Sequence, residues 1–308
     1  MTVVSSPPAP APVAGPEHRP PGVGVGERAV NLLNGTFLLV WALITTLPLL
    51  WAIVSAFKSN SEFLAEPFGL PGEPHVENFS RAWTVANIGQ YFVNSVVVVA
   101  ISVPLTMLLG AMAAYVLARY EFPGNRIVYY GFVGGMIFPV FLALVPLFFV
   151  VRNLSALPGV GQFLGLNSHV SLALVYVAFS LPFTVFFLTA FFRTQPTSIA
   201  EAAIVDGCSH FGLFFRVMLP MAKPGLISIG LFNVLGHWNQ YVLPVVLMNE
   251  PEKKVLAQGL AALAISQGYR GDWTALFAGL VIALLPVLVV YVLFQRQVQA
   301  GLTAGVLK

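Results

Sequence analysis

Charged side chains are scarce in this chain of 308 residues. Asp, Glu, Lys and Arg make up 9% of it, against about a quarter of a typical soluble domain, and hydrophobic residues make up 57%. The mean hydropathy is +0.84. Such a composition excludes a soluble globular fold and indicates a polytopic membrane protein. The net charge is only +3 and the basic residues are scattered through loops, so we expect no nucleic-acid partner.

Cysteine and paired metal ligands are also nearly absent. The single cysteine, Cys208, excludes an internal disulfide and a cysteine-based metal cluster. The histidines are scattered and no His-Glu-x-x-His motif occurs, which argues against an intramembrane metal hydrolase. No Gly-x-x-x-x-Gly-Lys-Ser/Thr motif occurs, so the chain has no P-loop with which to hydrolyse ATP itself. We therefore expect no catalytic residue, no metal and no cofactor in this chain.

What the chain does contain is a series of long runs without Asp, Glu, Lys or Arg. Each such charge costs several kcal/mol in hydrocarbon, and about twenty apolar residues cross a bilayer, so these runs predict membrane spans. The predicted spans lie at about 32–55, 93–117, 128–151, 170–192, 225–247 and 274–294. An ion-coupled secondary transporter is expected to carry an ionisable residue in mid-span, and none falls inside these six.

The ends of the chain differ from the membrane segments. Residues 1–30 are rich in proline and small residues, which predicts a disordered tail, and they lack the pattern of a cleaved signal peptide. An even number of spans puts both termini on one side. With the termini inside, nine Lys and Arg residues lie inside and six outside, which favours cytoplasmic termini. We expect a membrane domain at 31–294 and a cytoplasmic tail at 295–308.

The segment 196–224, between the fourth and fifth predicted spans, carries the clearest helix boundaries. Pro196 blocks continuation of the preceding helix, and Ser198 with Glu201 three residues later predicts a capping box that starts a short helix. Gly207 is expected to end that helix in the left-handed conformation, and Ser209 to cap the next one. The segment therefore predicts a helix-turn-helix at the membrane surface.

The second of these helices is predicted to end at Pro220 and to present one apolar face. The members of this face follow i, i+3, i+4, i+7 spacing: Phe211, Phe214, Phe215 and Met218. Asp206 breaks a local rule, because the helix macrodipole disfavours an anion in the last turn by about 0.3–1 kcal/mol. Its carboxylate either caps the following helix or contacts something outside the chain, and the sequence leaves both interpretations open.

These residues resemble the EAA signature of the permease subunits of binding-protein-dependent ABC importers. The matching positions are Glu201-Ala202-Ala203, Asp206-Gly207, Leu219-Pro220 and Pro224. In that family the loop is a coupling helix, which docks into a cleft on a cytoplasmic ATPase subunit. The resemblance implies that the same contact is made here by Glu201, Ala202, Ala203, Asp206, Gly207, Phe211, Phe214, Phe215, Leu219 and Pro220. For Glu201, a capping role and a docking role can coexist.

The fifth predicted span holds a polar face. Asn233, His237 and Gln240 fall within about 60° of arc on a helix, and buried polar groups without partners cost about 1–3 kcal/mol each. This face should therefore meet water, ligand or another polar surface, which makes it a candidate substrate path together with Asn239. Pro139 in the third span could bend that span so that it lines the same path. For His237 alone, helix packing is favoured over metal binding.

Two further stretches carry family resemblance. Trp238-Asn239-Gln240-Tyr241 resembles the fifth-span segment of sugar-importer permeases, although many relatives have an acidic residue where Gln240 stands. The end of the chain resembles the C-terminal tail of the smaller permease of maltose-type importers, which in some relatives reaches the ATPase dimer. The matching residues here are Gly301, Leu302, Thr303, Ala304 and Gly305. The outer loop 57–92 is expected to be a surface loop, and in the family such loops touch the solute-binding protein.

Taken together, the resemblance implies an all-α protein with six transmembrane helices and the type I ABC importer permease fold. It implies a bacterial or archaeal plasma-membrane subunit that moves a sugar or oligosaccharide by alternating access. The implied partners are a second permease subunit in a heterodimer, two cytoplasmic ATP-binding subunits and an extracytoplasmic solute-binding protein. A polyamine or other small-solute importer of the same type stays open as the alternative within this class.

Overall fold

A computed structural model describes the backbone of residues 25–304 and the side chains of residues 30–295 apart from 162 and 267–270. Most of the predicted disordered tail lies outside the described residues, but the first helix begins at Val25, inside the predicted boundary at residue 30. The described part of the chain is helical and contains no strand. Its elements in order are α1 Val25–Ser55, α2 Asn60–Ala65, α3 Glu77–Thr84, α4 Ile88–Arg119, α5 Asn125–Ile137, α6 Val140–Ser155, α7 Gly161–Leu164, α8 His169–Thr194, α9 Thr197–Val205, α10 His210–Gly212, the π-helix η1 Leu213–Met218, α11 Leu219–Met221, α12 Lys223–Trp238, α13 Val242–Leu247, the 3₁₀ helix η2 Pro251–Lys253, α14 Leu256–Arg270 and α15 Trp273–Ala304.

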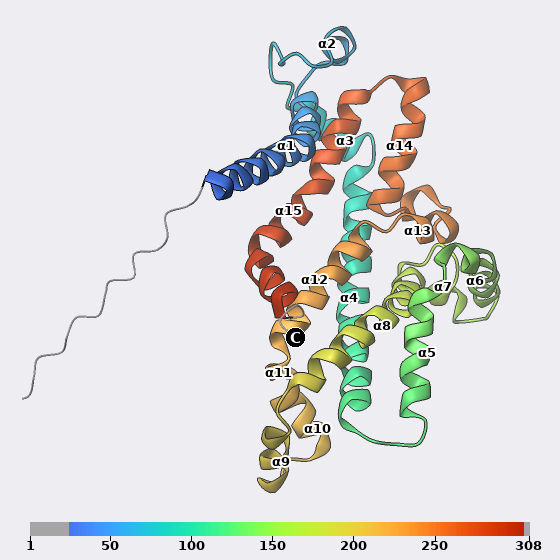
Figure 1. Cartoon of the computed structure of the whole chain (residues 1–308). Helices are drawn as coiled ribbons and strands as arrows, with labels where there is room; N and C mark the ends of the chain where they lie inside the picture. The colour runs from blue at the N-terminus through green and yellow to red at the C-terminus, as the bar shows by residue number, and fades with distance from the viewer. Residues whose placement is uncertain (1–24, 305–308) are drawn as a thin grey trace, which may run out of the picture. The chain divides into compact units, whose positions relative to one another are not determined.

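The chain divides into two units, residues 1–50 and residues 51–308. The described part of the first unit is the greater part of α1, where Phe37 and Trp41 stack with their ring centroids 6.4 Å apart. The second unit holds the other helices. At one end of this unit lie α9 and α10, and at the opposite end lie α3 and α14 (Figure 1).

Four described helices are long and apolar enough to cross a membrane, and two bent helix pairs raise the number to six if each pair is one span. The six agree in order with the predicted spans. The four single helices are Val30–Ser55, Ile88–Arg119, His169–Thr194 and Trp273–Gln295. The two bent pairs are Asn125–Ile137 with Val140–Ser155, and His210–Met221 with Lys223–Trp238.

The third predicted span, 128–151, is bent, as Pro139 allowed. Its two halves, α5 and α6, meet at an angle of 101°. The break falls at Phe138 and Pro139, both with extended backbone. Proline has no N–H to donate and disfavours helical backbone at the residue before it, which accounts for the position of the break.

The fifth predicted span, 225–247, is also interrupted. The helix α12 ends at Trp238, residues 239–241 are not helical, and the short helix α13 follows. The 16 residues of α12 reach about 24 Å at 1.5 Å per residue, which is less than the hydrocarbon core of about 30 Å. A complete crossing by this part of the chain therefore needs residues beyond α12.

The helices α4 and α8 form the central pair of the second unit. They approach so closely that a Cβ atom built on Gly110 would lie 2.5 Å from Cγ2 of Thr184. Small residues at such contacts let helix backbones pack tightly within a bilayer, where apolar burial alone gives little driving force. The cluster around this pair also takes in the π-helix η1, through Leu213, Phe214 and Met218.

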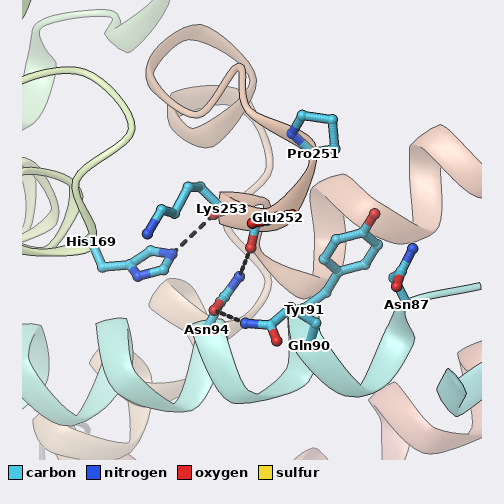
Figure 2. Close-up of a pocket in the computed structure, with 8 residues that line it drawn as sticks. All are labelled: Asn87, Gln90, Tyr91, Asn94, His169, Pro251, Glu252 and Lys253. Carbon is cyan, nitrogen blue, oxygen red and sulfur yellow. Dashed lines mark hydrogen bonds between the residues drawn. The ribbon is translucent and has the colours of Figure 1, made fainter.

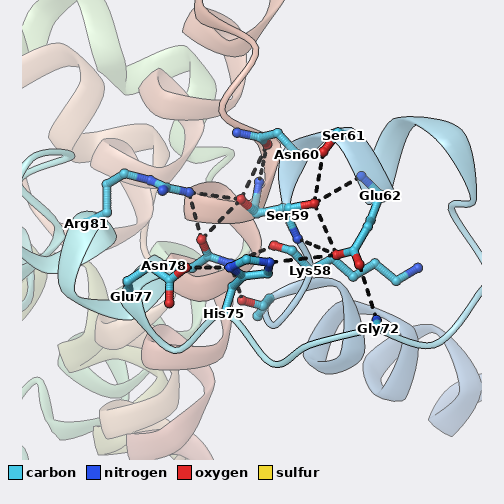
Figure 3. A network of polar contacts seen from close by, with 12 residues as sticks. Lys58, Ser59, Asn60, Ser61, Glu62, Gly72, His75, Glu77, Asn78 and Arg81 are labelled. Atoms are coloured by element: carbon cyan, nitrogen blue, oxygen red, sulfur yellow. Dashed lines mark hydrogen bonds and ion pairs between the residues drawn. The ribbon is translucent and has the colours of Figure 1, made fainter.

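The segment 57–92, expected to be a surface loop, contains two short helices and buried hydrogen bonds. The caps and turns around α2 and α3 form a network of polar contacts (Figure 3). Arg81 forms an ion pair with Asp272, in which Nε and Oδ2 lie 2.8 Å apart, and its Nη2 atom donates to Asn78 Oδ1 at 2.7 Å. Asn78, only 1% exposed, donates in turn to the carbonyl oxygens of Ala56 and Lys58. The network thus ties the segment to the start of α15.

The stretch 250–272, between the fifth and sixth predicted spans, contains the helix α14. Leu256 and Leu260 of α14 are buried in a cluster with Ile88, Leu276 and other residues of α4 and α15. This helix was not predicted, because its 15 residues are fewer than a membrane span needs. Its stability comes from packing against α15 rather than from its own length.

Candidate functional site

The segment 196–224 forms the two short helices predicted for it. The first, α9, is followed by Gly207, whose φ of +83° lies in the left-handed region. The second begins at Ser209, where the hydroxyl oxygen accepts a hydrogen bond from the N–H of Gly212 at 3.2 Å. The turn residue and the second cap are therefore as predicted, because both follow from local backbone chemistry.

Two other predictions for this segment are wrong. The residue that caps α9 is Pro196, with no side-chain hydrogen bond, so the capping box of Ser198 and Glu201 does not form. Ser198 lies inside the first turn instead. Pro220 does not end the second helix: it occupies the first turn of α11, where no N–H is needed, and a new helix starts at Lys223 after a bend of 77°.

The predicted apolar face of the second helix is divided in the structure. Phe214 and Met218 are 5% and 0% exposed, whereas Phe211 and Phe215 are 74% and 44% exposed. The cause is the π-helix η1, which spans Leu213–Met218 and changes the number of residues per turn. A spacing of i, i+3, i+4, i+7 no longer marks one face there. Nothing in the sequence signals this change.

The tip of the segment presents apolar side chains to its surroundings. Val205 is 86% exposed and Ile204 51% exposed, on the helix end next to Gly207. Glu201, Ala202 and Asp206 are exposed as well, while Ala203 packs partly against the core. Of the other predicted contact residues, Pro220 is exposed and Leu219 is half-buried. The tip therefore combines exposed apolar side chains with exposed charged ones.

Asp206 does not cap the second helix. Ser209 makes that contact, and within the described residues no hydrogen bond of the Asp206 carboxylate is found. The first of the two interpretations, that Asp206 caps the second helix, is therefore wrong. The carboxylate is exposed on the same surface as Val205 and Glu201.

The polar residues of the fifth span lie in two different environments. His237 is 6% exposed and bridges the central helix pair: Nδ1 lies 2.7 Å from Ser102 Oγ of α4, and Nε2 lies 2.8 Å from Ser180 Oγ of α8. Asn233, 4% exposed, donates to Thr184 Oγ1 at 3.0 Å. Both buried side chains therefore have hydrogen-bond partners, and these partners join α12 to α4 and α8.

The other predicted path residues lie at the two breaks in the spans. Asn239 is exposed and Gln240 is half-buried, both in the non-helical stretch after α12, so they do not continue the face of His237 as a straight helix would. Pro139 is exposed at the bend between α5 and α6. Non-helical backbone at membrane depth is tolerated only where it is buried in protein or lines a watery cavity. Both breaks leave backbone that is not fully covered by the described part of the chain.

A polar cleft of about 490 Å³ opens beside the start of α4, and Figure 2 shows the residues that line it. Its lining combines α4, the start of α8 and η2. Gln90 Nε2 donates to Asn94 Oδ1 at 3.0 Å, and Asn94 donates to the carbonyl oxygen of Glu252 at 2.8 Å. His169 Nε2 lies 3.0 Å from the carbonyl oxygen of Lys253. The sequence analysis missed this cleft because tertiary packing alone brings these distant stretches together.

The remaining predicted features concern metals and the C-terminal tail. Among the described residues, no group of three or more His, Cys, Asp and Glu side chains could hold a metal ion. The helix α15 continues through most of the predicted tail to Ala304. Gly301, Leu302 and Thr303 therefore lie in its last turns, and Gly305 lies outside the described residues.

The chain is similar in sequence to permease proteins of known transport systems. Residues 106–303 match the family described as binding-protein-dependent transport system inner membrane component. The diacetylchitobiose uptake system permease protein NgcG of Streptomyces coelicolor is 49% identical over 279 residues, covering 91% of this chain and 89% of the relative. The permease protein DasC of the same organism, also named for diacetylchitobiose uptake, is 31% identical over 262 residues, covering 85% and 91%.

A solved structure shares the fold. It is the crystal structure of a bacterial ABC transporter involved in the import of the acidic polysaccharide alginate, with a TM-score of 0.73, 21% identity, and coverage of 90% of this chain and 99% of the matched chain. The family match covers more than half of this chain, and the six candidate spans fit a multi-pass inner-membrane subunit. The chain therefore belongs to the family of binding-protein-dependent transport system inner membrane components, and it is a permease subunit of an ABC importer that works with other importer components, ATP hydrolysis being the task of a separate chain.

Proposed function

We propose that this permease carries an oligosaccharide of a few sugar units into the cell, with diacetylchitobiose as the first candidate. The observation that carries the proposal is the 49% identity with a permease named for diacetylchitobiose uptake, over nine-tenths of both chains. Other relatives are named for arabinooligosaccharides and for starch degradation products. These names favour a sugar over a polyamine as the solute.

The coupling surface is the exposed tip of 196–224. In this proposal Val205, Ile204 and Phe211 enter a cleft on a cytoplasmic ATPase subunit, with Glu201 and Asp206 at the rim of the contact. Support comes from the exposure of these apolar side chains on a loop between two membrane spans. Two ATPase subunits would serve the assembled importer, and both chain termini would lie on their side of the membrane.

The substrate path runs along the breaks in the third and fifth spans, near Pro139, Asn239 and Gln240. Buried His237 and Asn233 hold α12 against α4 and α8, so that the break moves with the central pair. Nucleotide-driven closure of the ATPases would shift the coupling surface and open the path to the opposite side of the membrane. The membrane helices would thus have two stable arrangements, and the bound nucleotide would select one of them.

Further partners complete the importer. The exposed breaks need a covering surface within the bilayer, and a second, different permease subunit supplies it in this proposal. The solute-binding protein docks at the end that carries α3, α14 and the polar cleft. The last turns of α15, from Gly301 to Ala304, extend toward the ATPase subunits.

The proposal is tested by uptake of labelled sugars in a strain that lacks this gene. We expect the deletion to abolish uptake of labelled diacetylchitobiose or a related short oligosaccharide, and the intact gene to restore it. Labelled spermidine serves as the matched solute of the alternative class. Unchanged oligosaccharide uptake together with lost spermidine uptake would overturn the sugar assignment.

A further inference from the structure

Two cavities lie side by side where the central helices end near the coupling surface. One is polar, with a volume of about 610 Å³, and the other is apolar, with a volume of about 500 Å³. They share the residues Tyr120, Glu121 and Phe122 in their walls. A ligand that fills both must carry a polar head and an apolar tail joined to one another.

The polar cavity collects positive charge from three elements. Arg119 ends α4, Arg126 lies in the first turn of α5 and Arg193 lies in the last turn of α8, and all three line the cavity. Glu121 is the acidic residue in its wall. Among the ion pairs found in the described residues, none involves these arginines. Their charge is therefore available to an anion.

Two of the arginines are held in place by neutral partners. Arg119 Nη2 donates to the carbonyl oxygen of Gln195 at 2.7 Å, and its Nε atom is buried without a hydrogen-bond partner in the described structure. The guanidinium of Arg193 lies over the ring of Tyr129, 5.3 Å from the centroid. Fixed guanidinium groups bind phosphate with little loss of side-chain entropy.

The start of α5 adds to the positive field. Gly124 precedes this helix with a φ of +89°, and no side chain caps it. The first turn of this 13-residue helix lines the cavity through Asn125, Arg126 and Ile127, and the positive end of a helix dipole favours an anion.

The apolar cavity provides the other half of the site. It is lined by Met112 and Val116 of α4, by Phe211 and Phe214, and by the shared residues. His210 also lines it, but its Nδ1 atom is engaged by the hydroxyl of Tyr120 at 2.9 Å. A free inorganic anion would leave these walls without a partner. An acyl chain matches them.

We propose that an anionic phospholipid binds here, with its phosphate among Arg119, Arg126 and Arg193 and an acyl chain in the adjoining apolar cavity. The location supports this occupant. The spans formed by α4 and α8 end at Arg119 and Thr194, and the next span begins at Asn125, so the arginines lie at the depth of the lipid headgroups. Basic pockets between membrane helices at this depth recognise anionic lipid headgroups.

The test uses the full chain, purified in mild detergent and reconstituted into phosphatidylcholine nanodiscs with and without phosphatidylglycerol. Native mass spectrometry measures which lipid stays bound. We expect selective retention of phosphatidylglycerol and an affinity about 30-fold lower in the double variant Arg126→Gln/Arg193→Gln, since each basic residue near a membrane surface contributes a factor of about 5. Arg152→Gln, an exposed arginine outside both cavities, should retain the lipid as wild type does.

Two further arms separate the lipid from other occupants. Val116→Trp fills the apolar cavity and should weaken phosphatidylglycerol retention while leaving the arginines intact. Inorganic phosphate and glycerol phosphate, at millimolar concentration, should fail to displace the lipid from the wild-type chain. Equal retention of phosphatidylcholine by the wild-type chain, or displacement by inorganic phosphate, would overturn the proposal even if a variant does not fold. So would a double variant that retains phosphatidylglycerol as the wild-type chain does.

Discussion

A single glycine forms the turn after α9, at the tip of the segment 196–224. Gly207 has a φ of +83°, and a Cβ atom at this position would meet nothing within 4 Å, so a substitution there acts through backbone strain and not through a clash. A residue with a side chain loses about 1–2 kcal/mol in this conformation, whereas asparagine tolerates it. The strain would turn α9 away from the orientation in which its apolar tip is presented.

We predict that Gly207→Val largely abolishes solute-stimulated ATP hydrolysis in the reconstituted importer, while Gly207→Asn keeps most of it. The matched control is Gly159→Val, at a glycine with a φ of +72° and no neighbour within 4 Å, in the loop after α6. The measurement is phosphate release with and without the loaded solute-binding protein. Full stimulation in Gly207→Val would remove this residue from the coupling role.

His237 and Gln240 have different expected effects although both belong to the predicted path. His237→Ala leaves Ser102 and Ser180 without their buried partner and creates a cavity, so we expect a loss of about 2–4 kcal/mol in stability. Gln240→Ala, at the break after α12, should change stability by less than about 0.5 kcal/mol and alter the uptake kinetics. Thermal unfolding in detergent and sugar uptake measure the two effects. Wild-type stability in His237→Ala would contradict the packing role.

At the scale of elements, the same sequence pattern gives two outcomes. Ser59 and Glu62 form a full capping box at the start of α2, whereas Ser198 and Glu201, with the same spacing, do not. The difference is Pro196, whose extended backbone occupies the cap position itself and makes the helix start at Thr197. A pattern of four residues therefore predicts a capping box only where the preceding residue lets the serine stay outside the helix.

The capping box at α2 leads to a pH prediction. Hydrogen bonds from the backbone N–H and hydroxyl of Ser59 hold the pKa of Glu62 below its ordinary value of 4.5. A carboxylate with a lowered pKa in the native state stabilises the fold above that ordinary value, and this stabilisation is lost as the pH falls through the native pKa. We expect the difference in Tm between wild type and Glu62→Gln to shrink as the pH is lowered from 7 to below 4. Glu73→Gln serves as the exposed control, and a constant difference would contradict the role of the box.

The junction between α3 and α15 depends on the pair Arg81 and Asp272. A double-mutant cycle with Arg81→Met and Asp272→Asn should give a coupling energy of about 1–2 kcal/mol, because the pair is partly buried and shares several hydrogen bonds. The more exposed pair of His75 and Glu77 should give less than about 1 kcal/mol. Chemical unfolding of the purified chain measures both cycles. Equal coupling in the two pairs would mean that the network does not fix the outer segment.

At the scale of the whole molecule, the orientation in the membrane can be tested directly. The only cysteine, Cys208, lies beside Gly207 in the coupling surface and is partly exposed. We predict that a membrane-impermeant maleimide labels it in inverted vesicles and not in intact cells. In a Cys208→Ser background, Ser61→Cys in α2 should show the opposite pattern. Labelling of Cys208 from outside intact cells would place the coupling surface on the wrong side.

Composition and spacing predicted much of this protein, namely the membrane class, the order of the six candidate spans and the turn at Gly207 with its cap at Ser209. These features depend on the cost of charge in hydrocarbon and on short stretches of backbone, so neighbouring residues suffice to determine them. The roles of the coupling residues and of the path residues stay predictions.

Other features depend on contacts between residues far apart in the chain. The register change in η1 buries Phe214 and exposes Phe211, and the contacts of His237 with Ser102 and Ser180 join three helices. The short helix α14 is stable because Leu256 and Leu260 pack against α4 and α15. In each case the energy comes from partners that sequence spacing does not identify, so a local pattern gives the residue types but not the contacts that they make.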